Sequence, residues 1–403
     1  MGLNDVASGE RVHIGFFGRR NVGKSSLVNA VTGQALSVVS DVRGTTTDPV
    51  KKAMELLPIG PVVIIDTPGY DDVGDLGLLR VEKTREILAK TDVAILVADA
   101  AEGMGDTETE LLALFAERKL PVITVYNKAD LIAEIPATDE NGIYVSALRK
   151  TGIEELKNRI GALAKTRENT KRLVSDLLSP GDIAVLVIPI DESAPKGRLI
   201  LPQQQTIRDL LDNHISVVCC QDTEVRQTLS MLAKKPKLVI TDSQAFGRVS
   251  GDVPEDIMLT SFSILFARYK GDLPTLVKGA AALAELRDGD RVLISEGCTH
   301  HRQCGDIGTV KMPAWIEKFS GAKPVYAFTS GGEFPADLSE YKVVVHCGGC
   351  MLNEAEMGHR IRTAAEAGVP MVNYGIAIAQ MHSILARSLE PFPEVLALLN
   401  TAK

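Results

Sequence analysis

One glycine-rich segment combines the residue types that bind phosphate groups. Gly18-Arg-Arg-Asn-Val-Gly-Lys-Ser25 follows the apolar run VHIGFF and precedes the helical pattern SLVNAVTG. Glycines allow backbone N–H groups to curl around phosphates, and the N-terminus of the following helix adds a favourable dipole. We expect Lys24 to reach the β- and γ-phosphates and the Ser25 hydroxyl to bind Mg²⁺. The predicted nucleotide contacts of this loop are Asn21, Val22, Gly23, Lys24, Ser25 and Ser26.

Three further motifs follow in a consistent order, each at the end of an apolar β-branched run. Asp66-Thr-Pro-Gly69 follows VVIIDT, Asn127-Lys-Ala-Asp130 follows PVITVYN, and Ser146-Ala147 follows GIYV. The carboxyl ends of parallel strands meet at one edge of an open sheet, where α/β proteins bind ligands. This order makes a chance occurrence of the glycine-rich pattern implausible.

The chemistry of these motifs selects a guanine nucleotide. The Asp130 carboxylate would accept hydrogen bonds from the guanine N1–H and 2-amino groups, which adenine cannot offer together. Ser146 and Ala147 would contact the O6 edge by backbone. Asp66 would hold Mg²⁺ through water, and the Gly69 N–H would sense the γ-phosphate. Asn127 and Lys128 complete the predicted contacts. The sequence therefore predicts binding and hydrolysis of GTP, with Lys24, Asp66 and Gly69 in the reacting centre.

A second group of reactive side chains lies near the C-terminus. Cys298-Thr-His300 follows the run RVLISEG, and His346-Cys347-Gly-Gly-Cys350 ends the run KVVVHC. If the two strands are parallel neighbours, their thiols converge at one sheet edge. Three cysteines and two histidines predict a metal site, either zinc or a [4Fe–4S] cluster with one replaceable position. Either histidine is an alternative for the fourth ligand. Because successive strand residues face opposite ways, a regular strand would turn His346 away from the metal.

The elements that must position these residues form an α/β pattern. Short Val- and Ile-rich runs alternate with helical patterns along the whole chain, which predicts mostly parallel sheets covered on both faces. A turn signal at Ser179-Pro-Gly181 and a softer one at Tyr269–Asp272 divide the chain. We predict three domains: a P-loop fold over residues 1–174, then two smaller mostly parallel α/β units over 175–270 and 271–403.

The composition of the chain argues against two classes of partner, nucleic acids and membranes. The chain has 403 residues and a formal net charge of -8, so it receives no general electrostatic help in binding nucleic acid or anionic membranes. It shows no membrane-length apolar run and no signal-peptide pattern. We expect a cytoplasmic protein without nucleic-acid or membrane partners. In that compartment its six cysteines are interpreted as metal ligands, redox groups or buried residues.

The first four motifs resemble those of the Era/TrmE type of translation-factor-like GTPases over about residues 10–165. Gly44-Thr-Thr-Thr-Asp48 is similar to that group's switch I signature. The resemblance implies that Thr46 is a second Mg²⁺ ligand and that Asn21 supports a K⁺ ion beside the phosphates. Tyr70 stands where Ras-like enzymes have a water-orienting glutamine, so we expect slow, K⁺-stimulated hydrolysis. Leu148 replaces the lysine often found after Ser146-Ala147, a mild loss.

The cysteine–histidine pattern resembles that of the HydF family of [FeFe]-hydrogenase maturation GTPases. C-x-H, 45 intervening residues and H-C-x-x-C match its signature. The resemblance implies that Cys298, Cys347 and Cys350 hold a [4Fe–4S] cluster in the last domain and that the middle domain forms a homodimer. It further implies a scaffold or carrier for a transient di-iron subcluster precursor. Two radical-SAM maturases would supply this unit, and apo-[FeFe]-hydrogenase would receive it.

Two other functions stay open at this point. Era/TrmE-like domains often act on RNA or the ribosome, and a zinc-stabilised C-terminal module could use GTP only as a switch. The remaining conspicuous residues are interpreted structurally. We expect Cys219 and Cys220 to be buried or half-buried in a strand, Cys304 to pack, and Trp315 and Phe319 to share the core-facing side of a helix.

Overall fold

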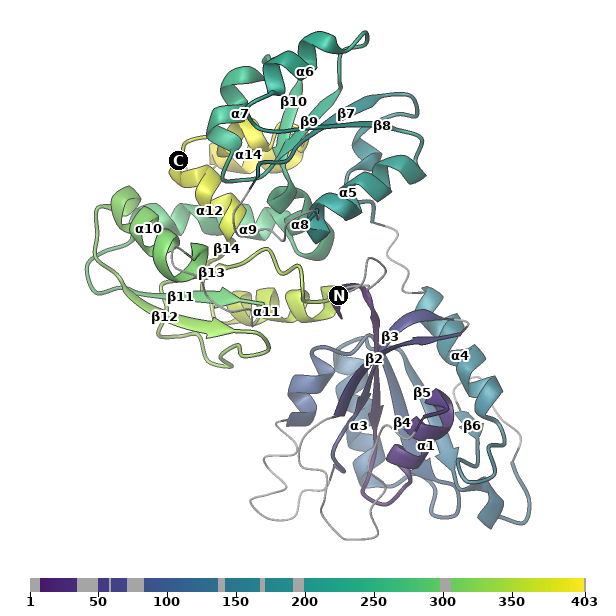
Figure 1. Ribbon diagram of the computed structural model, residues 1–403. Coiled ribbons are helices and arrows are strands. Elements are labelled where there is room, and N and C mark those ends of the chain that lie inside the picture. The colour runs from purple at the N-terminus through teal and green to yellow at the C-terminus, as the bar shows by residue number, and fades with distance from the viewer. Residues whose placement is uncertain are drawn as a thin grey trace. The chain divides into compact units, whose positions relative to one another are not determined.

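The β-branched runs of the sequence form the strands of three sheets, and parallel pairing dominates each of them (Figure 1). The predicted α/β fold is therefore confirmed. The computed structural model describes residues 8–34, 50–57, 59–70, 83–136, 142–166, 171–190, 199–297 and 306–401. The chain divides into two compact units, Met1–Asn169 and Thr170–Lys403.

The first unit contains a six-stranded sheet in the order β2-β3-β1-β4-β5-β6. Only the pairing of β2 with β3 is antiparallel among the described strands of this sheet. Its strands are β1 (Val12–Phe17), β2 (Val50–Leu56), β3 (Gly60–Asp66), β4 (Val93–Asp99), β5 (Val122–Asn127) and β6 (Gly142–Tyr144). Its helices are α1 (Lys24–Thr32), α3 (Asp106–Glu117) and α4 (Ile153–Thr166), with short turns η1 (Ser8–Glu10) and η2 (Ala129–Leu131), and residues 83–88 are also helical.

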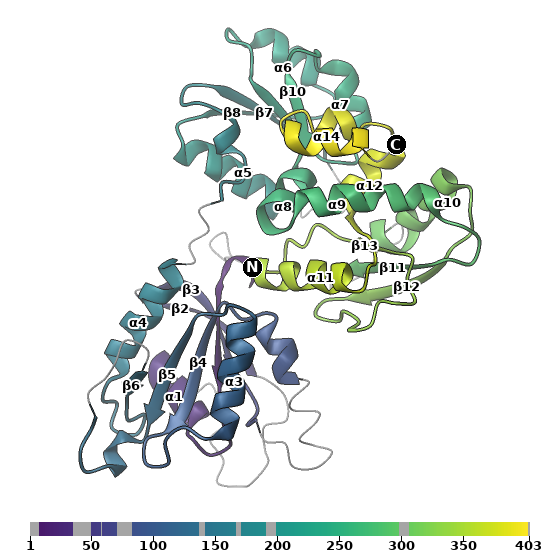
Figure 2. The ribbon, with the colours of Figure 1, turned by 180° about the vertical axis from the view of Figure 1, so that it is seen from behind.

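Helices cover both faces of this sheet, as its continuous apolar strands require. Alternate residues of β1 enter different cores: Phe16 packs with α1 and α4, whereas Phe17 packs with α3. Figure 2 shows α3 on the face opposite α1. The central strand β4 is buried along its full length. Two layers of helices thus fix the positions of the strand ends.

The second unit contains two parallel four-stranded sheets, in the orders β10-β9-β7-β8 and β12-β11-β13-β14. The strands are β7 (Ile183–Val187), β8 (Ser216–Cys220), β9 (Leu238–Thr241), β10 (Met258–Ser261), β11 (Arg291–Glu296), β12 (Val325–Ser330), β13 (Val343–His346) and β14 (Met371–Asn373). The helices are α5 (Leu201–Asp212), α6 (Val225–Met231), α7 (Phe246–Asp252), α8 (Phe262–Lys270), α9 (Leu273–Gly279), α10 (Met312–Ser320), α11 (Glu354–Glu366), α12 (Tyr374–Met381), α13 (Leu385–Ser388) and α14 (Pro393–Thr401), with turns η3 (Ser175–Leu177), η4 (Ala280–Glu285) and η5 (Ile307–Lys311).

One continuous apolar core joins the two small sheets. Leu186 of β7 and Ile294 of β11 belong to it, and α8, α9 and α12 lie between the sheets (Figures 1 and 2). Helix α13, near the end of the sequence, also contacts the sheet that contains β10, because the Thr260 hydroxyl donates to the Ser388 carbonyl at 2.9 Å. The division into domains at residues 174/175 and 270/271 stays a prediction, since both small sheets share this core.

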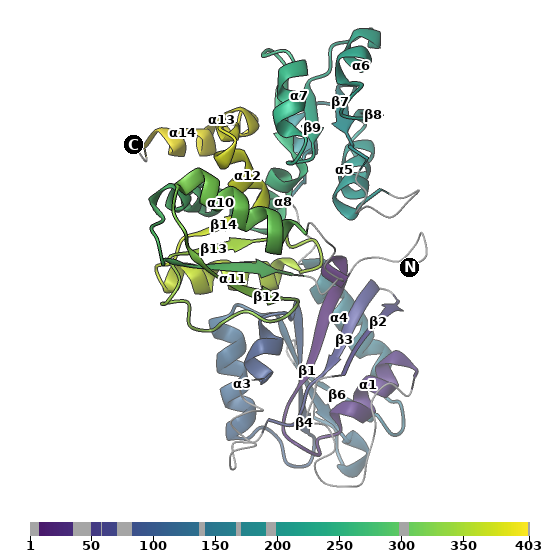
Figure 3. The same cartoon turned by 60° about the vertical axis from the view of Figure 1, so that its left-hand side comes forward.

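The last sheet has a topological switch point. From β11 the chain moves to β12 on one side and then to β13 on the other, so α10 and α11 cover opposite faces (Figure 3). In open α/β sheets, ligands bind beyond the carboxyl ends of the strands at such a point. The carboxyl ends of β11 and β13 are therefore the expected position of a site in this sheet.

Some of the residues for which the sequence predicted a packing role are at least partly buried in the structure, and one is exposed. Trp315 and Phe319 pack against the core, as predicted. Cys219 and Cys220 lie in β8 as predicted, but Cys219 is exposed because β8 is an edge strand with one solvated face. Cys304 lies outside the described residues. No helix in the described part of the chain has the length and apolar character needed to cross a bilayer.

Candidate nucleotide and cluster sites

The glycine-rich loop connects β1 to α1 and approaches two neighbouring strands closely. Gly18 has φ 142°, and a Cβ added there would lie 2.2 Å from the Val97 carbonyl oxygen. Gly23 has φ 87°, and its added Cβ would lie 2.4 Å from Asn127 Nδ2. Both positions therefore require glycine for conformation and for space. The loop is seated against the ends of β4 and β5, as a P-loop requires.

Lys24 is the first residue of α1, and its ammonium lies within the loop. Nζ donates to the Gly18 carbonyl at 2.9 Å and to the Arg19 carbonyl at 2.7 Å. The residue is buried. The loop thus holds its cation at the centre of the ring of backbone groups that surrounds a bound phosphate.

Ser25 and Asp66 form a pair that suits a divalent cation. Ser25 Oγ donates to Asp66 Oδ2 at 2.6 Å, and the buried Asp66 Oδ1 has no hydrogen-bond partner. A hydroxyl beside a carboxylate oxygen without a donor is the oxygen donor set that Mg²⁺ prefers. Gly69 lies against the loop, since its added Cβ would be 2.9 Å from Arg20 Cα. Thr46 lies outside the described residues.

Asn127 connects the loop to the motifs expected to contact guanine. Its Nδ2 donates to the Val22 carbonyl at 3.0 Å, and its Oδ1 accepts from the Ala147 N–H at 3.1 Å. Ser146 Oγ donates to Asp130 Oδ1 at 2.5 Å, and this bond lowers the pKa of Asp130 below its usual value. The Asp130 carboxylate is therefore ionised, as an acceptor of guanine N–H groups must be.

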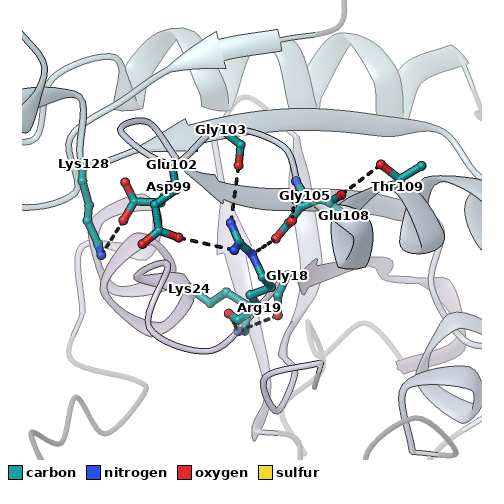
Figure 4. A network of polar contacts seen from close by, with 10 residues as sticks. All are labelled: Gly18, Arg19, Lys24, Asp99, Glu102, Gly103, Gly105, Glu108, Thr109 and Lys128. Carbon is teal, nitrogen blue, oxygen red and sulfur yellow. Dashed lines mark hydrogen bonds and ion pairs between the residues drawn. The ribbon is translucent and has the colours of Figure 1, made fainter. Parts of the chain in front are cut away.

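A partly buried ion pair connects the loop to α3, and it was not predicted from the sequence. Arg19 Nε donates to Glu108 Oε1 of α3 at 2.7 Å, and Nη1 lies 3.3 Å from Glu102 Oε2 (Figure 4). Glu108 Oε2 also accepts the Gly105 N–H at 3.0 Å. The hydrogen bond to Glu108 is the main cause that raises the pKa of Arg19. Arg19 is therefore directed toward α3.

Lys128 forms a second polar contact in the same view. Its Nζ lies 2.8 Å from Asp99 Oδ2 at the end of β4 (Figure 4). Burial acts to raise the pKa of Asp99, but hydrogen bonds from Lys128 and the Ala101 N–H outweigh it, and the pKa lies below its usual value. This contact fixes the Asn127–Asp130 segment to the strand beside it.

Tyr70 occupies the position at which Ras-like enzymes have a water-orienting glutamine. Its side chain is buried, and its hydroxyl donates to Glu110 Oε1 of α3 at 2.8 Å. Its backbone N–H donates to the Gly18 carbonyl at 3.2 Å. The phenol is thus committed to α3 and does not provide a substitute for the glutamine.

Cys347 lies at the switch point of the last sheet. The strands β11 and β13 are parallel neighbours, as the convergence of their thiols requires. The Gly297 N–H donates to Cys347 Sγ at 3.0 Å, and the Gly349 N–H approaches the same sulfur at 3.4 Å. Gly349 has φ 64°, which lets the CGGC turn fold back on itself. Gly297 directly precedes Cys298, which lies outside the described residues.

Cys350 and Lys270 meet on the other side of the turn. Lys270 Nζ donates to the carbonyls of Cys350 and Leu352, each at 3.1 Å. Burial raises the pKa of the Cys350 thiol, and the neighbouring Cys347 raises it further, while the Lys270 charge lowers it. Lys270 is the last residue of α8, which directly follows β10 of the other small sheet. No sequence motif indicated this lysine.

His346 is fully buried, and both of its ring nitrogens are engaged. Nε2 lies 3.0 Å from Arg360 Nη1, and Nδ1 lies 2.7 Å from the Cys347 carbonyl. A guanidinium only donates, so Nε2 accepts and Nδ1 carries the proton that is donated to Cys347. Arg360 is also buried and pairs with Glu356 at 2.8 Å. Among the alternatives left open, this geometry favours a hydrogen-bonding role for His346.

Two cysteines of the C-terminal motifs, Cys347 and Cys350, lie among the described residues. Cys219, Cys220 and Cys350 are free thiols. Among the described residues, no group of three or more His, Cys, Asp or Glu side chains is arranged to hold a metal ion. Cys298 and His300 both lie outside that part of the chain, so their predicted roles stay predictions.

Three family models match consecutive parts of the chain. A 50S ribosome-binding GTPase model matches residues 13–128. A hydrogen maturase F dimerization domain model matches residues 173–271, and a hydrogen maturase F tetramerization domain model matches residues 274–391. The chain belongs to the hydrogen maturase F (HydF) family. With the GTPase model and the site geometry, this HydF-family chain is a GTPase that binds GTP and Mg²⁺.

Individual relatives share only the GTPase part. The tRNA modification GTPase MnmE of Nitrosomonas europaea is 37% identical over 165 residues, which are 39% of this chain and 35% of that protein. The MnmE of Clostridioides difficile is 34% identical over 154 residues, 36% of this chain and 33% of that protein. The HydF-family chain thus spans roughly a third of the length of these curated relatives.

One solved structure resembles this chain only weakly. Era of Aquifex aeolicus, bound to GDP and aluminium fluoride, matches with a TM-score of 0.34 and 20% identity over 59% of this chain and 97% of that one. A score this low carries no argument about function, and the assignment rests on the family models and the site geometry.

Proposed function

We propose that this HydF-family GTPase binds a [4Fe–4S] cluster through Cys298, Cys347 and Cys350, and that it assembles or delivers a di-iron subcluster for apo-[FeFe]-hydrogenase. One observation carries the proposal. The Gly297 N–H, one residue before Cys298, donates to Cys347 Sγ at the switch point between β11 and β13. Gly297 and Cys347, 50 positions apart in the chain, thus lie at one sheet edge, which supports the proposal.

The surroundings of Cys347 suit an iron–sulfur cluster. Two backbone N–H groups, from Gly297 and Gly349, point at its sulfur, and such hydrogen bonds stabilise the negative charge of cluster sulfurs. A cluster held by three thiolates would keep one iron position replaceable, and such a position suits a carrier. His346 would orient the turn through the Cys347 carbonyl, while His300 stays an alternative as fourth ligand.

In the GTPase unit, the chain's own residues bind and orient the nucleotide. Lys24 would exchange the carbonyls of Gly18 and Arg19 for phosphate oxygens, and Asp130 would accept the guanine N–H groups. Bound Mg²⁺ supplies neutralising charge between the phosphates. Tyr70 leaves the attacking water without an orienting amide, so turnover would be slow. Asn21, in the left-handed region with φ 64°, is the proposed K⁺ ligand that stimulates it.

Partners are part of the same proposal. Two of the matched family models are named for dimerization and tetramerization, which supports an oligomer; we propose a homodimer through the region of residues 175–270. Two radical-SAM maturases would provide the di-iron unit, and a reducing cytoplasm would keep the cysteines reduced. Nucleic acid is not among the proposed partners, because the chain has a net charge of -8.

Anaerobic metal analysis with EPR spectroscopy of the reduced protein tests the proposal. We expect iron and sulfide to co-purify with the chain, and C298A, C347A and C350A each to lose the cluster while GTP turnover persists. The matched control is C219A, because Cys219 is an exposed thiol on the edge strand β8. About one zinc per chain, with no iron–sulfur absorbance, would instead support a zinc-stabilised interaction module.

A further inference from the structure

Arg19 and Arg20 are consecutive residues of the phosphate-binding loop, and their guanidinium groups differ in their partners. Arg19 is directed toward α3, where it pairs with Glu108 and Glu102 (Figure 4). The Arg20 side chain, by contrast, forms no ion pair within the described part of the chain. Its Nη2 is buried and has no hydrogen-bond partner among the described residues. The loop therefore carries a buried donor that these residues leave unsatisfied.

A buried donor without an acceptor is costly, because it has given up its hydrogen bonds with water. A guanidinium stays charged in proteins and can only donate. The partner that would satisfy Arg20 is therefore an acceptor, and the positive charge favours an anion. An anionic ligand of the loop meets both requirements, whereas a neutral acceptor meets only the first.

The position of Arg20 indicates which anion would meet it. A Cβ added to Gly69 would lie 2.9 Å from both Cα and Cβ of Arg20, so the two residues are in contact. The Tyr70 N–H donates to the Gly18 carbonyl at 3.2 Å, which keeps this segment against the loop. Gly69 is the residue predicted to sense the γ-phosphate, and Lys24 is predicted to reach it from the loop. Arg20 thus lies where these two segments meet beside the predicted terminal phosphate.

A second group of the same site has the opposite requirement. The buried Asp66 Oδ1 is an acceptor, and it also lacks a hydrogen-bond partner among the described residues. The Arg20 donor and the Asp66 acceptor do not satisfy each other. A phosphate with its Mg²⁺ would satisfy both, because phosphate oxygens accept from the guanidinium and the hydrated cation binds the carboxylate. The two unmet groups therefore suit a nucleotide phosphate better than they suit a free cation.

We propose that Arg20 donates to the γ-phosphate of bound GTP and stabilises the charge of the transition state. Hydrolysis forms a bond between a water oxygen and the γ-phosphorus and breaks the bond from this phosphorus to the oxygen shared with the β-phosphate. The electron pair of that bond leaves with GDP, and both hydrogens of the water pass to inorganic phosphate. An arginine supplied within the chain can stabilise this step without a partner protein. The inference concerns GTP hydrolysis and does not depend on cluster binding.

The experiment compares four full-length proteins: wild type, R20M, R20K and R208M. The matched control is R208M, because Arg208 is an exposed arginine of α5 that pairs with Asp212 at the surface. Single-turnover hydrolysis of GTP with Mg²⁺ measures the chemical step. Competition binding measures the Kd of GDP and of a non-hydrolysable GTP analogue. All assays contain KCl, so that any contribution of K⁺ is the same in every protein.

We expect R20M to lower the single-turnover rate by about 20- to 30-fold, the ratio between GTPases with an arginine in cis and Ras-like enzymes without one. The analogue should bind about tenfold more weakly, because a charged hydrogen bond is lost, while the Kd of GDP stays within about twofold of wild type. The variant R20K should fall between R20M and wild type, because an ammonium keeps the charge but loses the planar fork. The control R208M should match wild type.

A wild-type rate in R20M would overturn the inference. Equal losses of affinity for GDP and for the analogue would overturn it as well, because they would assign Arg20 a role in the shape of the loop instead of a contact with the γ-phosphate. If circular dichroism shows R20M to be unfolded, R20K decides the question. It must slow hydrolysis and weaken the analogue more than GDP, and otherwise the inference fails.

Discussion

Two carboxylates approach the same arginine of the P-loop, and burial separates their effects. The Glu108 side chain is fully buried, whereas that of Glu102 is 65% exposed. Water and salt screen an exposed pair, which typically contributes about 0–1 kcal/mol, whereas the buried Glu108 carboxylate is screened less and needs its partner cation more. The Arg19 carbonyl also receives the Lys24 ammonium, so the side-chain anchor fixes the backbone on which Lys24 rests. Glu108 is therefore the residue through which α3 orders the loop.

We expect E108Q to weaken guanine nucleotide binding by about tenfold, equivalent to about 1.4 kcal/mol, because the P-loop loses its buried anchor. The matched control is E102Q, which should stay within about twofold of wild type because its pair is screened. Fluorescence titration with a labelled GDP measures both. Equal losses in the two variants would show that burial does not decide the contribution.

Asp130 controls base selection by the direction of its hydrogen bonds. Its carboxylate only accepts, and the bond from Ser146 keeps it ionised. The variant D130N presents an amide that donates toward position 2 of the base, where guanine also donates and xanthine has an oxygen. We expect GTP affinity to fall about 10- to 150-fold, the range for losing a charged hydrogen bond, and xanthosine triphosphate to become the preferred nucleotide. Competition binding with the two nucleotides measures this, and an unchanged preference would contradict the assigned role.

At the scale of elements, the CGGC turn depends on one of its two glycines. Gly349 has φ 64°, and an added Cβ would lie 2.8 Å from Met357 Sδ of α11. Gly348 has open space around it, with no atom within 4 Å of an added Cβ. Gly349 therefore determines how the turn meets α11, while position 348 tolerates a side chain.

We expect G349A to lower the free energy of unfolding by about 1–2 kcal/mol, the cost of left-handed backbone in a non-glycine residue, and to reduce iron uptake. The variant G348A should have little effect on either. Chemical denaturation and iron analysis of the two proteins check the difference. If both variants lose iron equally, the left-handed backbone of Gly349 would not be what distinguishes the two positions.

The sequence predicts elements and motifs well where the information is local. The motifs at residues 18–25, 66–69 and 127–130 lie at strand ends, and periodicity and glycine spacing locate these. The contacts of Arg19 with Glu108, and of Lys270 with Cys350, join residues 89 and 80 positions apart. No local pattern encodes such contacts, because they depend on how distant elements pack against one another. The exposure of Cys219 likewise depends on β8 being an edge strand, which requires the strand order.

At the scale of the whole molecule, the two compact units have separate cores. The apolar clusters around β1 draw on residues before 165, and those around β7 and β11 draw on residues after 172, so no cluster among the described residues spans the two units. The two small sheets, by contrast, share one cluster. We therefore expect the two small sheets to unfold together in one cooperative transition. The GTPase unit should unfold in a separate transition.

Calorimetry of the full chain with and without GDP and Mg²⁺ tests this division. A ligand at a hundred times its Kd stabilises the unit that binds it by about 2.7 kcal/mol. For a unit of this size the shift corresponds to about 5–10 °C in Tm. We expect one of two transitions to move by this amount and the other to stay in place, because the residues predicted to contact the nucleotide all lie within Met1–Asn169. The variant D130N serves as control and should reduce the shift to about half or less, because its expected loss of affinity lowers the ratio of ligand concentration to Kd. A single transition that moves as a whole would show that the second unit depends on the first for its stability.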